Sequence, residues 1–109
     1  MPDYSKGKIY KIVTDKADLP PYFGSTVNEL RKRKNEHKYQ CKKWVEGKYH
    51  YKTSFNIFKI DNNAKIILVE EYPCENKYQL ERRERYYIEN YPCVNRNNPA
   101  PTREDYNAR

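Results

Sequence analysis

Apolar and β-branched residues cluster in three short runs that predict strands. Two of these runs, residues 8–14 and 21–26, are separated by a turn rich in aspartate and proline, which predicts a hairpin. The third run, residues 64–72, is the clearest strand in the chain, and its continuous apolar residues predict a position at the centre of the sheet. We therefore expect a small, three-stranded and mainly antiparallel sheet.

Two longer stretches have the residue spacing of helices. Residues 28–40 follow the hairpin, and Thr26 or Asn28 can cap the first turn of the helix that they predict. Residues 76–91 predict the second helix, with Asn76 as its cap. A three-stranded sheet flanked by these helices is a small α/β domain of the α+β type.

The segment between the first helix and the third strand mixes aromatic residues with lysines. We predict a loop or a short irregular helix over residues 38–52, and a short helix or turn over residues 53–60. Four residues of the latter are expected in the core: Phe55, Ile57, Phe58 and Ile60. The aromatic residues of the former suit stacking on a nucleic-acid strand, but we favour a packing role for them. These residues are Trp44, Tyr49 and Tyr51.

The length of the chain, 109 residues, suits one domain with a single modest core. We predict that this domain spans residues 1–98. Residues 99–109 are predicted to be a C-terminal tail or the start of a truncated helix, in which case the chain is a fragment of a longer protein.

Charge and cysteine content narrow the function classes. A formal net charge of +7 and a pI of about 9.3 favour a polyanionic partner such as nucleic acid, although lysine-rich surfaces are also common without one. The three cysteines are widely spaced, which is typical of reduced thiols in an intracellular protein. No apolar run approaches the roughly 18 residues of a membrane span, so no membrane partner is expected.

Polar residues that could take part in a reaction converge from the hairpin and the first helix. Tyr10 and Tyr22 lie on the two strands of the hairpin. Arg33 and His37 share a face of the first helix with Leu30. Two tyrosines, an arginine and a histidine in this arrangement are more typical of an active site than of a core.

Glu84 is the most informative single residue of the sequence. It lies one turn after Leu80 in the apolar stripe of the second helix, just before Tyr87 and Ile88. A carboxylate in such a position is costly unless a cation or a metal ion balances it. A purely structural ion pair with Arg83 or Lys34 is the alternative.

These residues, in this order, resemble the GIY-YIG nuclease superfamily. The first motif appears as Lys8-Ile9-Tyr10 and the second as Tyr22-Phe23-Gly24-Ser25-Thr26. The helices then match in Asn28, Leu30, Arg33, His37, Leu80, Arg83, Glu84, Tyr87 and Ile88, followed by Asn95. The sequence departs from the family pattern at Lys8, which replaces a glycine, and at Phe23, which replaces an isoleucine.

The resemblance implies a metal-dependent endonuclease that hydrolyses phosphodiester bonds in DNA and leaves a 5′-phosphate. One Mg²⁺ or Mn²⁺ ion per site would be held by Glu84, and Arg33 would clamp the scissile phosphate. The catalytic set is completed by three residues that hold and deprotonate the attacking water, together with a bracing amide: Tyr10, Tyr22, His37 and Asn95. We favour His37 as the base, directly or through a tyrosine, because its ordinary pKa lies close to neutrality.

DNA is the implied partner, and four lysines of the first helix region are expected to attract its phosphates: Lys32, Lys34, Lys42 and Lys43. Cutting both strands would require either two domains, as in a dimer, or two sequential nicks. An appended domain could direct the enzyme to its target. The alternative function is a non-catalytic, basic nucleic-acid-binding module.

Overall fold

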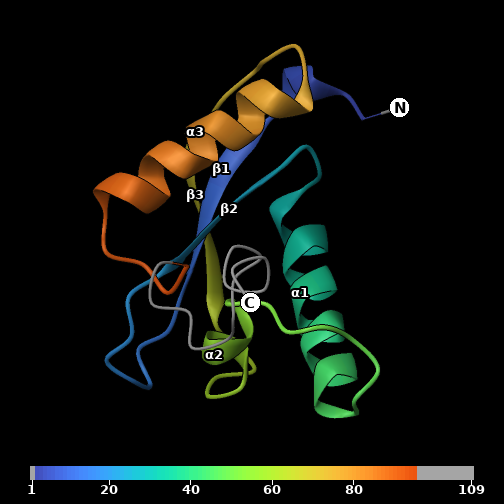
Figure 1. The fold of residues 1–109 in the computed structure, drawn as a ribbon, viewed down its shortest axis with the longest axis vertical. Helices are drawn as coiled ribbons and strands as arrows, with labels where there is room; N and C mark the ends of the chain where they lie inside the picture. The colour runs from blue at the N-terminus through green and yellow to red at the C-terminus, as the bar shows by residue number, and fades with distance from the viewer. Residues whose placement is uncertain (1, 96–109) are drawn as a thin grey trace, which may run out of the picture.

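A three-stranded antiparallel sheet forms the middle layer of the computed structural model, which describes residues 2–95 (Figure 1). Along the chain, the elements are a 3-10 helix, η1 (Tyr4–Lys6), then β1 (Lys8–Val13), β2 (Tyr22–Thr26), α1 (Leu30–Val45), α2 (Phe55–Phe58), β3 (Lys65–Glu71) and α3 (Lys77–Asn90). The predicted α+β class and the antiparallel pairing are confirmed. The expected tail at 99–109 and the domain boundary at residue 98 lie outside the described residues.

The central strand of the sheet is β1, and not β3 as its apolar sequence predicted. The strand order is β2-β1-β3, and both neighbours are antiparallel to β1. Ile9, Tyr10 and Ile12 of β1 are completely buried, whereas Ile67 and Leu68 of the edge strand β3 are 40% and 45% exposed. The prediction failed because an apolar edge strand and an apolar central strand have the same local sequence pattern.

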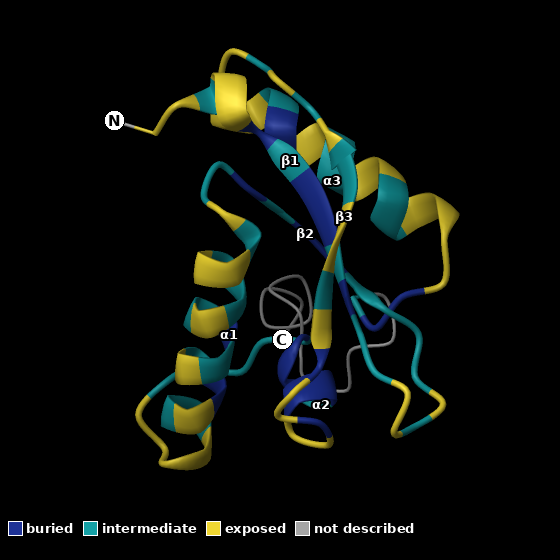
Figure 2. Cartoon of the chain, turned by 180° about the vertical axis from the view of Figure 1, so that it is seen from behind, coloured by how far each residue is buried: buried dark blue, intermediate teal, exposed yellow. Residues whose placement is uncertain are grey.

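Helices cover the sheet on both faces. Tyr10 and Ile12 point into a core that α1 and α2 complete, with Cys41 from α1 and Phe55 from α2. Phe23 alternates to the opposite face of β2, where its ring stacks on Tyr87 of α3 at a centroid distance of 5.6 Å. Figure 2 shows the result, with β1 buried between the layers and the outer surfaces of α1 and α3 exposed.

The first helix begins later and ends later than predicted. Its N-cap is Glu29, which makes no side-chain capping bond. The expected cap residues instead form a turn before the helix, because the Asn28 amide donates to Thr26 Oγ1 (3.0 Å) and the Asn28 carbonyl accepts from Lys8 Nζ (3.0 Å). Lys8, the departure from the first motif, therefore braces the entry into α1.

The helix continues to Val45 because its last turns belong to the core. Cys41 is buried one turn after His37, and the Trp44 ring packs on Phe55 at a centroid distance of 5.6 Å. Gly47, with a φ of +79°, follows the end of the helix, where a left-handed residue is easily accommodated by glycine. The loop prediction for residues 38–52 is thus wrong for residues 38–45.

The aromatic residues near Trp44 pack around α2, as we favoured from the sequence. The rings of Tyr49 and Tyr51 lie 6.4 and 6.1 Å from that of Phe55. Three of the four predicted core residues are buried: Phe55, Ile57 and Phe58. Ile60, in contrast, is 47% exposed, because the chain turns towards β3 after α2. No helix in residues 2–95 is long and apolar enough to cross a membrane.

The pairing of β1 with β2 places Gly24 directly opposite Tyr10. A Cβ atom at Gly24 would overlap the ring and the hydroxyl of Tyr10, whose buried position leaves them no room to move. We predict that Gly24→Ala lowers the free energy of unfolding by about 1–3 kcal/mol, measured by urea denaturation, because the added methyl overpacks the core.

The matched control is Gly47→Asn, which tests a glycine in open space. Nothing lies within 4 Å of a Cβ atom at Gly47, and asparagine tolerates its left-handed backbone. This variant is expected to stay within about 0.5 kcal/mol of the wild type. Equal effects of the two substitutions would contradict a steric role for Gly24.

Candidate active site

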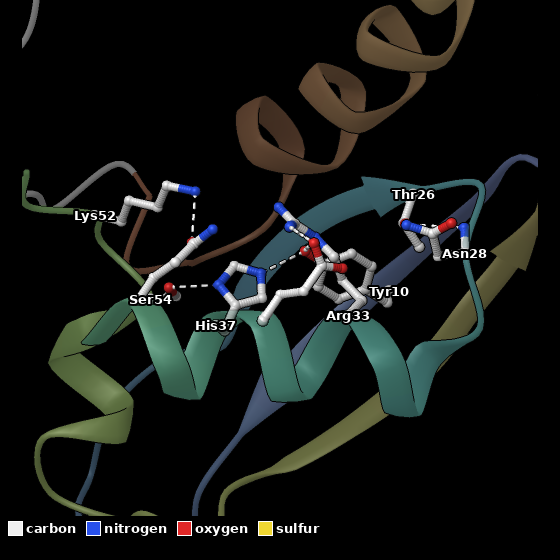
Figure 3. A network of polar contacts seen from close by, with 9 residues as sticks. Tyr10, Thr26, Asn28, Arg33, His37, Lys52 and Ser54 are labelled. Carbon is white, nitrogen blue, oxygen red and sulfur yellow. Dashed lines mark hydrogen bonds and ion pairs between the residues drawn. The ribbon is translucent and has the colours of Figure 1, made fainter. Parts of the chain in front are cut away.

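The hydroxyl of Tyr10 is the hub of a buried polar network between β1 and α1 (Figure 3). It lies 2.7 Å from Nε2 of His37 and accepts a hydrogen bond of 3.1 Å from Nε of Arg33. Arg33 and His37 are one turn apart on α1, so both side chains reach the same strand. The predicted convergence of these three residues is observed.

His37 is fully buried and uses both ring nitrogens. Its second nitrogen, Nδ1, lies 2.9 Å from Oγ of Ser54, and its ring packs against those of Tyr22 and Phe58. Burial lowers the pKa of His37 to about 3, with further contributions from the positive charges of Arg33 and Lys52. The imidazole is therefore neutral, and its Nε2 contacts the hydroxyl of Tyr10.

The two tyrosines connect His37 to a cleft. Burial raises the pKa of Tyr10 to about 12, although the adjacent Arg33 opposes this shift. Burial also raises the pKa of Tyr22, and the neighbouring Tyr10 adds to this effect. Tyr10 has no exposed surface, whereas Tyr22 is partly exposed and lines the cleft. Tyr22 is thus the member of the pair that meets solvent.

The cleft, of about 370 Å³, brings Glu84 of α3 together with Arg33 of α1. Glu84 accepts a hydrogen bond of 2.5 Å from Oγ of Ser25 on β2. Burial raises the pKa of Glu84 and the negative charge of Glu81 adds to the shift, while the Ser25 hydroxyl opposes it. The expected alternative partner Arg83 binds elsewhere, with bonds of 2.6 and 3.0 Å to the carboxylate of Glu70.

The free edge of β2 explains how residues from opposite faces of the sheet share one cleft. Ser25 alternates to the α3 face together with Phe23, while Tyr22 and Thr26 point to the α1 face. The strand has a partner only on its β1 side among the described strands. Glu84 and Arg33 therefore approach around the open edge, where no further strand separates them.

Asn95 closes another part of this edge rather than the cleft itself. Its Oδ1 accepts from the amide of Phe23 (3.0 Å) and its Nδ2 donates to the carbonyl of Phe23 (2.9 Å). The amide side chain thus acts like a short piece of neighbouring strand. It braces β2 next to Tyr22 and does not line the cleft that contains Arg33 and Glu84.

The four lysines that are predicted to attract DNA phosphates all lie on α1 but have different neighbours. Lys32 borders a hollow with Glu36 and Tyr39, whereas Lys42 borders a different one with Phe58 and Lys59. Lys43 pairs with Glu46 at 3.6 Å. The side chain of Lys34 is half-buried.

A divalent cation fits the carboxylate side of the cleft. Glu81 and Glu84 both line it, and the unfavourable neighbourhood of two negative charges is what a bound cation would relieve. Within residues 2–95 no cluster of three metal-ligating side chains exists. This donor set suits Mg²⁺ or Mn²⁺, which retain most of their water ligands, better than an ion that requires an all-protein cage.

Three residues of the site were not singled out by the sequence. Ser25 was recognised only as part of a motif, although it holds Glu84. Lys77 lines the cleft from the first turn of α3, and Ser54 contacts His37 across seventeen residues of chain. No local pattern marks Lys77 or Ser54, because their positions depend on how α2 and α3 dock.

Comparison with known protein families, with curated proteins and with solved structures finds no match for this chain.

The buried, neutral state of His37 predicts an acid-dependent loss of stability. The pKa of His37 is about 3 in the folded protein and 6.5 ordinarily, so below pH 6.5 only the unfolded chain takes up this proton. The free energy of unfolding should fall between pH 6.5 and 3, by up to about 1.4 kcal/mol per pH unit from this residue. Urea unfolding of the wild type and of His37→Gln at several pH values measures the difference.

The variant serves as the control, because all other titrating groups remain. Glu84, whose pKa is raised, contributes with the opposite sign in both proteins, so its effect cancels in the comparison. Parallel pH profiles for the two proteins would rule out a buried neutral His37.

The paired bonds of Asn95 predict a strong effect of a nearly isosteric change. In Asn95→Asp an ionised carboxylate oxygen would face the Phe23 carbonyl in place of the Nδ2 donor. We expect a loss of about 1–3 kcal/mol in the free energy of unfolding. Asn62→Asp, in an exposed turn, introduces the same charge and should change stability little. A comparable loss in both variants would show that the charge, and not the paired bonds, is responsible.

Proposed function

We propose that this protein is a metal-dependent endonuclease that hydrolyses phosphodiester bonds in DNA at the open edge of β2. The observation that carries the proposal is the shared cleft of Glu84 and Arg33, with Arg33 bonded to a buried Tyr10–His37 pair. A carboxylate that could bind a cation and a guanidinium, both lining one cleft, suit the binding of a phosphodiester there. The resemblance to the GIY-YIG nuclease superfamily assigns the same roles to these residues.

Arg33 is suited to bind the scissile phosphate. Its Nε is held by Tyr10, while its NH1 lies 3.8 Å from Oε2 of Glu36. A separation of this length makes a weak ion pair, which a doubly hydrogen-bonded phosphate can replace. The guanidinium would then offset the charge that develops on phosphorus oxygens during the attack of water.

The tyrosines and His37 are suited to receive the proton of the attacking water. Tyr22 meets the cleft and its ring neighbours that of Tyr10, whose hydroxyl contacts Nε2 of His37. The positive charge of Arg33 contributes to the low pKa of His37, so a phosphate that offsets this charge raises that pKa. Substrate binding thus makes the imidazole a better base at the moment when it is needed.

Glu84, with Glu81 beside it, would hold one Mg²⁺ or Mn²⁺ ion. When bound, such an ion stabilises negative charge on the leaving 3′-oxygen and on a phosphate oxygen. Ser25 orients the Glu84 carboxylate, and a bound cation would offset the cost of burying its charge, the same burial that raises its pKa. The product would carry its phosphate on the 5′ side.

DNA is the proposed substrate because the chain is strongly basic and the cleft is edged by cations. The net charge of +7 favours association with a polyanion, and Lys77 and Arg33 line the cleft itself. Lys32, Lys34, Lys42 and Lys43 add to this field from α1. One site per domain cuts one strand, so cutting both requires a dimer, an appended domain or two nicks. An intracellular location accords with such a substrate.

A basic nucleic-acid-binding module without catalysis is the second candidate. The observation in its favour is that no group in the network titrates near neutrality, since the pKa of His37 is about 3 and that of Tyr10 about 12. If these pKa values stay unchanged when DNA and metal bind, the network could only stabilise the fold and could not transfer protons.

Nicking of a supercoiled plasmid tests the proposal directly. We expect nicking with Mg²⁺ or Mn²⁺ that EDTA abolishes, and a loss of at least about a hundredfold in Glu84→Gln, because the amide is a poor ligand for a hard cation. Arg33→Lys should lose roughly tenfold or more, because lysine cannot form the forked contact. DNA binding in EDTA should be kept in both variants.

Glu71→Gln is the matched control for Glu84→Gln. It removes the same charge from an exposed position at the end of β3 and should cut like the wild type. Undiminished nicking by Glu84→Gln would refute the metal assignment. Binding of plasmid, flapped and branched DNA without cleavage of any of them would favour the binding module.

A further inference from the structure

Ser54 is a buried hydroxyl that its own helix does not use. It is the N-cap residue of α2, a position where serine side chains usually accept a bond from the helix amides, yet it makes no such bond. The side chain is completely buried, and its Oγ lies 2.9 Å from Nδ1 of His37 (Figure 3). A buried hydroxyl is costly unless it forms a hydrogen bond, and this contact explains how the Ser54 hydroxyl can be buried.

The direction of the hydrogen bonds follows from Arg33, which can only donate. Its Nε–H occupies one lone pair of the Tyr10 oxygen. Of the two described side chains that bond this hydroxyl, only His37 can accept its proton, at Nε2 2.7 Å away.

A neutral imidazole that accepts at Nε2 carries its proton on Nδ1. That Nδ1–H needs an acceptor, because it is buried with the rest of the ring. Oγ of Ser54 is the atom in place to accept it. The chain of donors therefore runs from Tyr10 through His37 to Ser54.

We propose that Ser54 is a positioning residue that holds His37 as the Nδ1–H tautomer and so keeps Nε2 available to take a proton from Tyr10. The catalytic consequence rests on the proposed nuclease function, but the tautomer does not. In the reaction, water gives a proton to the Tyr22 oxygen, Tyr22 passes its own to Tyr10, and Tyr10 passes its own to Nε2. The water oxygen bonds to phosphorus, and the P–O3′ bond breaks with its electron pair on O3′.

The tautomer is measured in the full chain without any substrate. The sequence has only two histidines, His37 and His50, so ring nitrogen correlations in protein labelled with ¹⁵N-histidine are readily assigned. We expect the proton of His37 on Nδ1 in the wild type and in Ser54→Thr, which keeps the hydroxyl. A proton on Nε2 in the wild type would overturn the proposal, whether or not Ser54→Ala folds.

A double-mutant cycle measures the catalytic consequence with a nicked-DNA assay. Ser54→Ala is expected to lower kcat roughly tenfold with KM unchanged, and Ser54→Thr to restore most of it. In a His37→Gln background, Ser54→Ala should have no further effect, because the residue acts through the imidazole. An equal loss in both backgrounds would show a merely structural role and would overturn the proposal.

The two measurements separate failure of this inference from failure of the proposed function. If the wild type cuts no DNA while His37 carries its proton on Nδ1 in a Ser54-dependent manner, the nuclease assignment falls and the positioning role stands. If the wild type cuts DNA while Ser54→Ala leaves both tautomer and kcat unchanged, the nuclease assignment stands and the positioning role falls.

Discussion

The complete burial of the Tyr10 hydroxyl is the constraint on which the rest of the structure depends. Tyr10 occupies the central strand, so its polar tip is placed where water cannot satisfy it. Arg33 and His37 satisfy that tip from α1, and this requirement fixes the rotation of the helix against the sheet. Gly24 leaves room for the ring from the other side. The hydrogen-bond network that brings Tyr10, Arg33 and His37 together thus also orients α1 against the sheet.

At the open edge of β2, this buried network reaches the surface through the cleft that Tyr22 and Arg33 line. An edge strand exposes backbone groups that need partners, and Asn95 supplies them at Phe23. Further along the same edge, Ser25 turns towards Glu84 while Tyr22 faces α1. A cleft at an edge collects side chains from both faces of a sheet, which a site above one face cannot do.

Local patterns in the sequence were sufficient to predict the helices and strands and most of the residues of the cleft. They were insufficient where a feature depends on how the elements pack against one another. The one-turn spacing of Arg33 and His37 and the place of Glu84 in an apolar stripe follow from helical periodicity alone. The central position of β1 depends on which strands pair, and the partner of His37 depends on where α2 docks. His37 looked like an accessible base because burial, which sets its pKa, is a tertiary property.

In the proposed nuclease, the charge of Arg33 would link substrate binding to proton transfer. In the free protein its charge adds to the effect of burial in keeping His37 neutral, and Lys52 acts in the same direction. A phosphate at Arg33 would remove the larger of these two electrostatic contributions without any movement of the imidazole. Burial still opposes protonation of the ring, so the stabilisation must come from the substrate's own negative charge. In the proposed reaction, such a base would stay neutral until a phosphodiester is bound, which would limit unproductive proton uptake by a site that lies next to solvent.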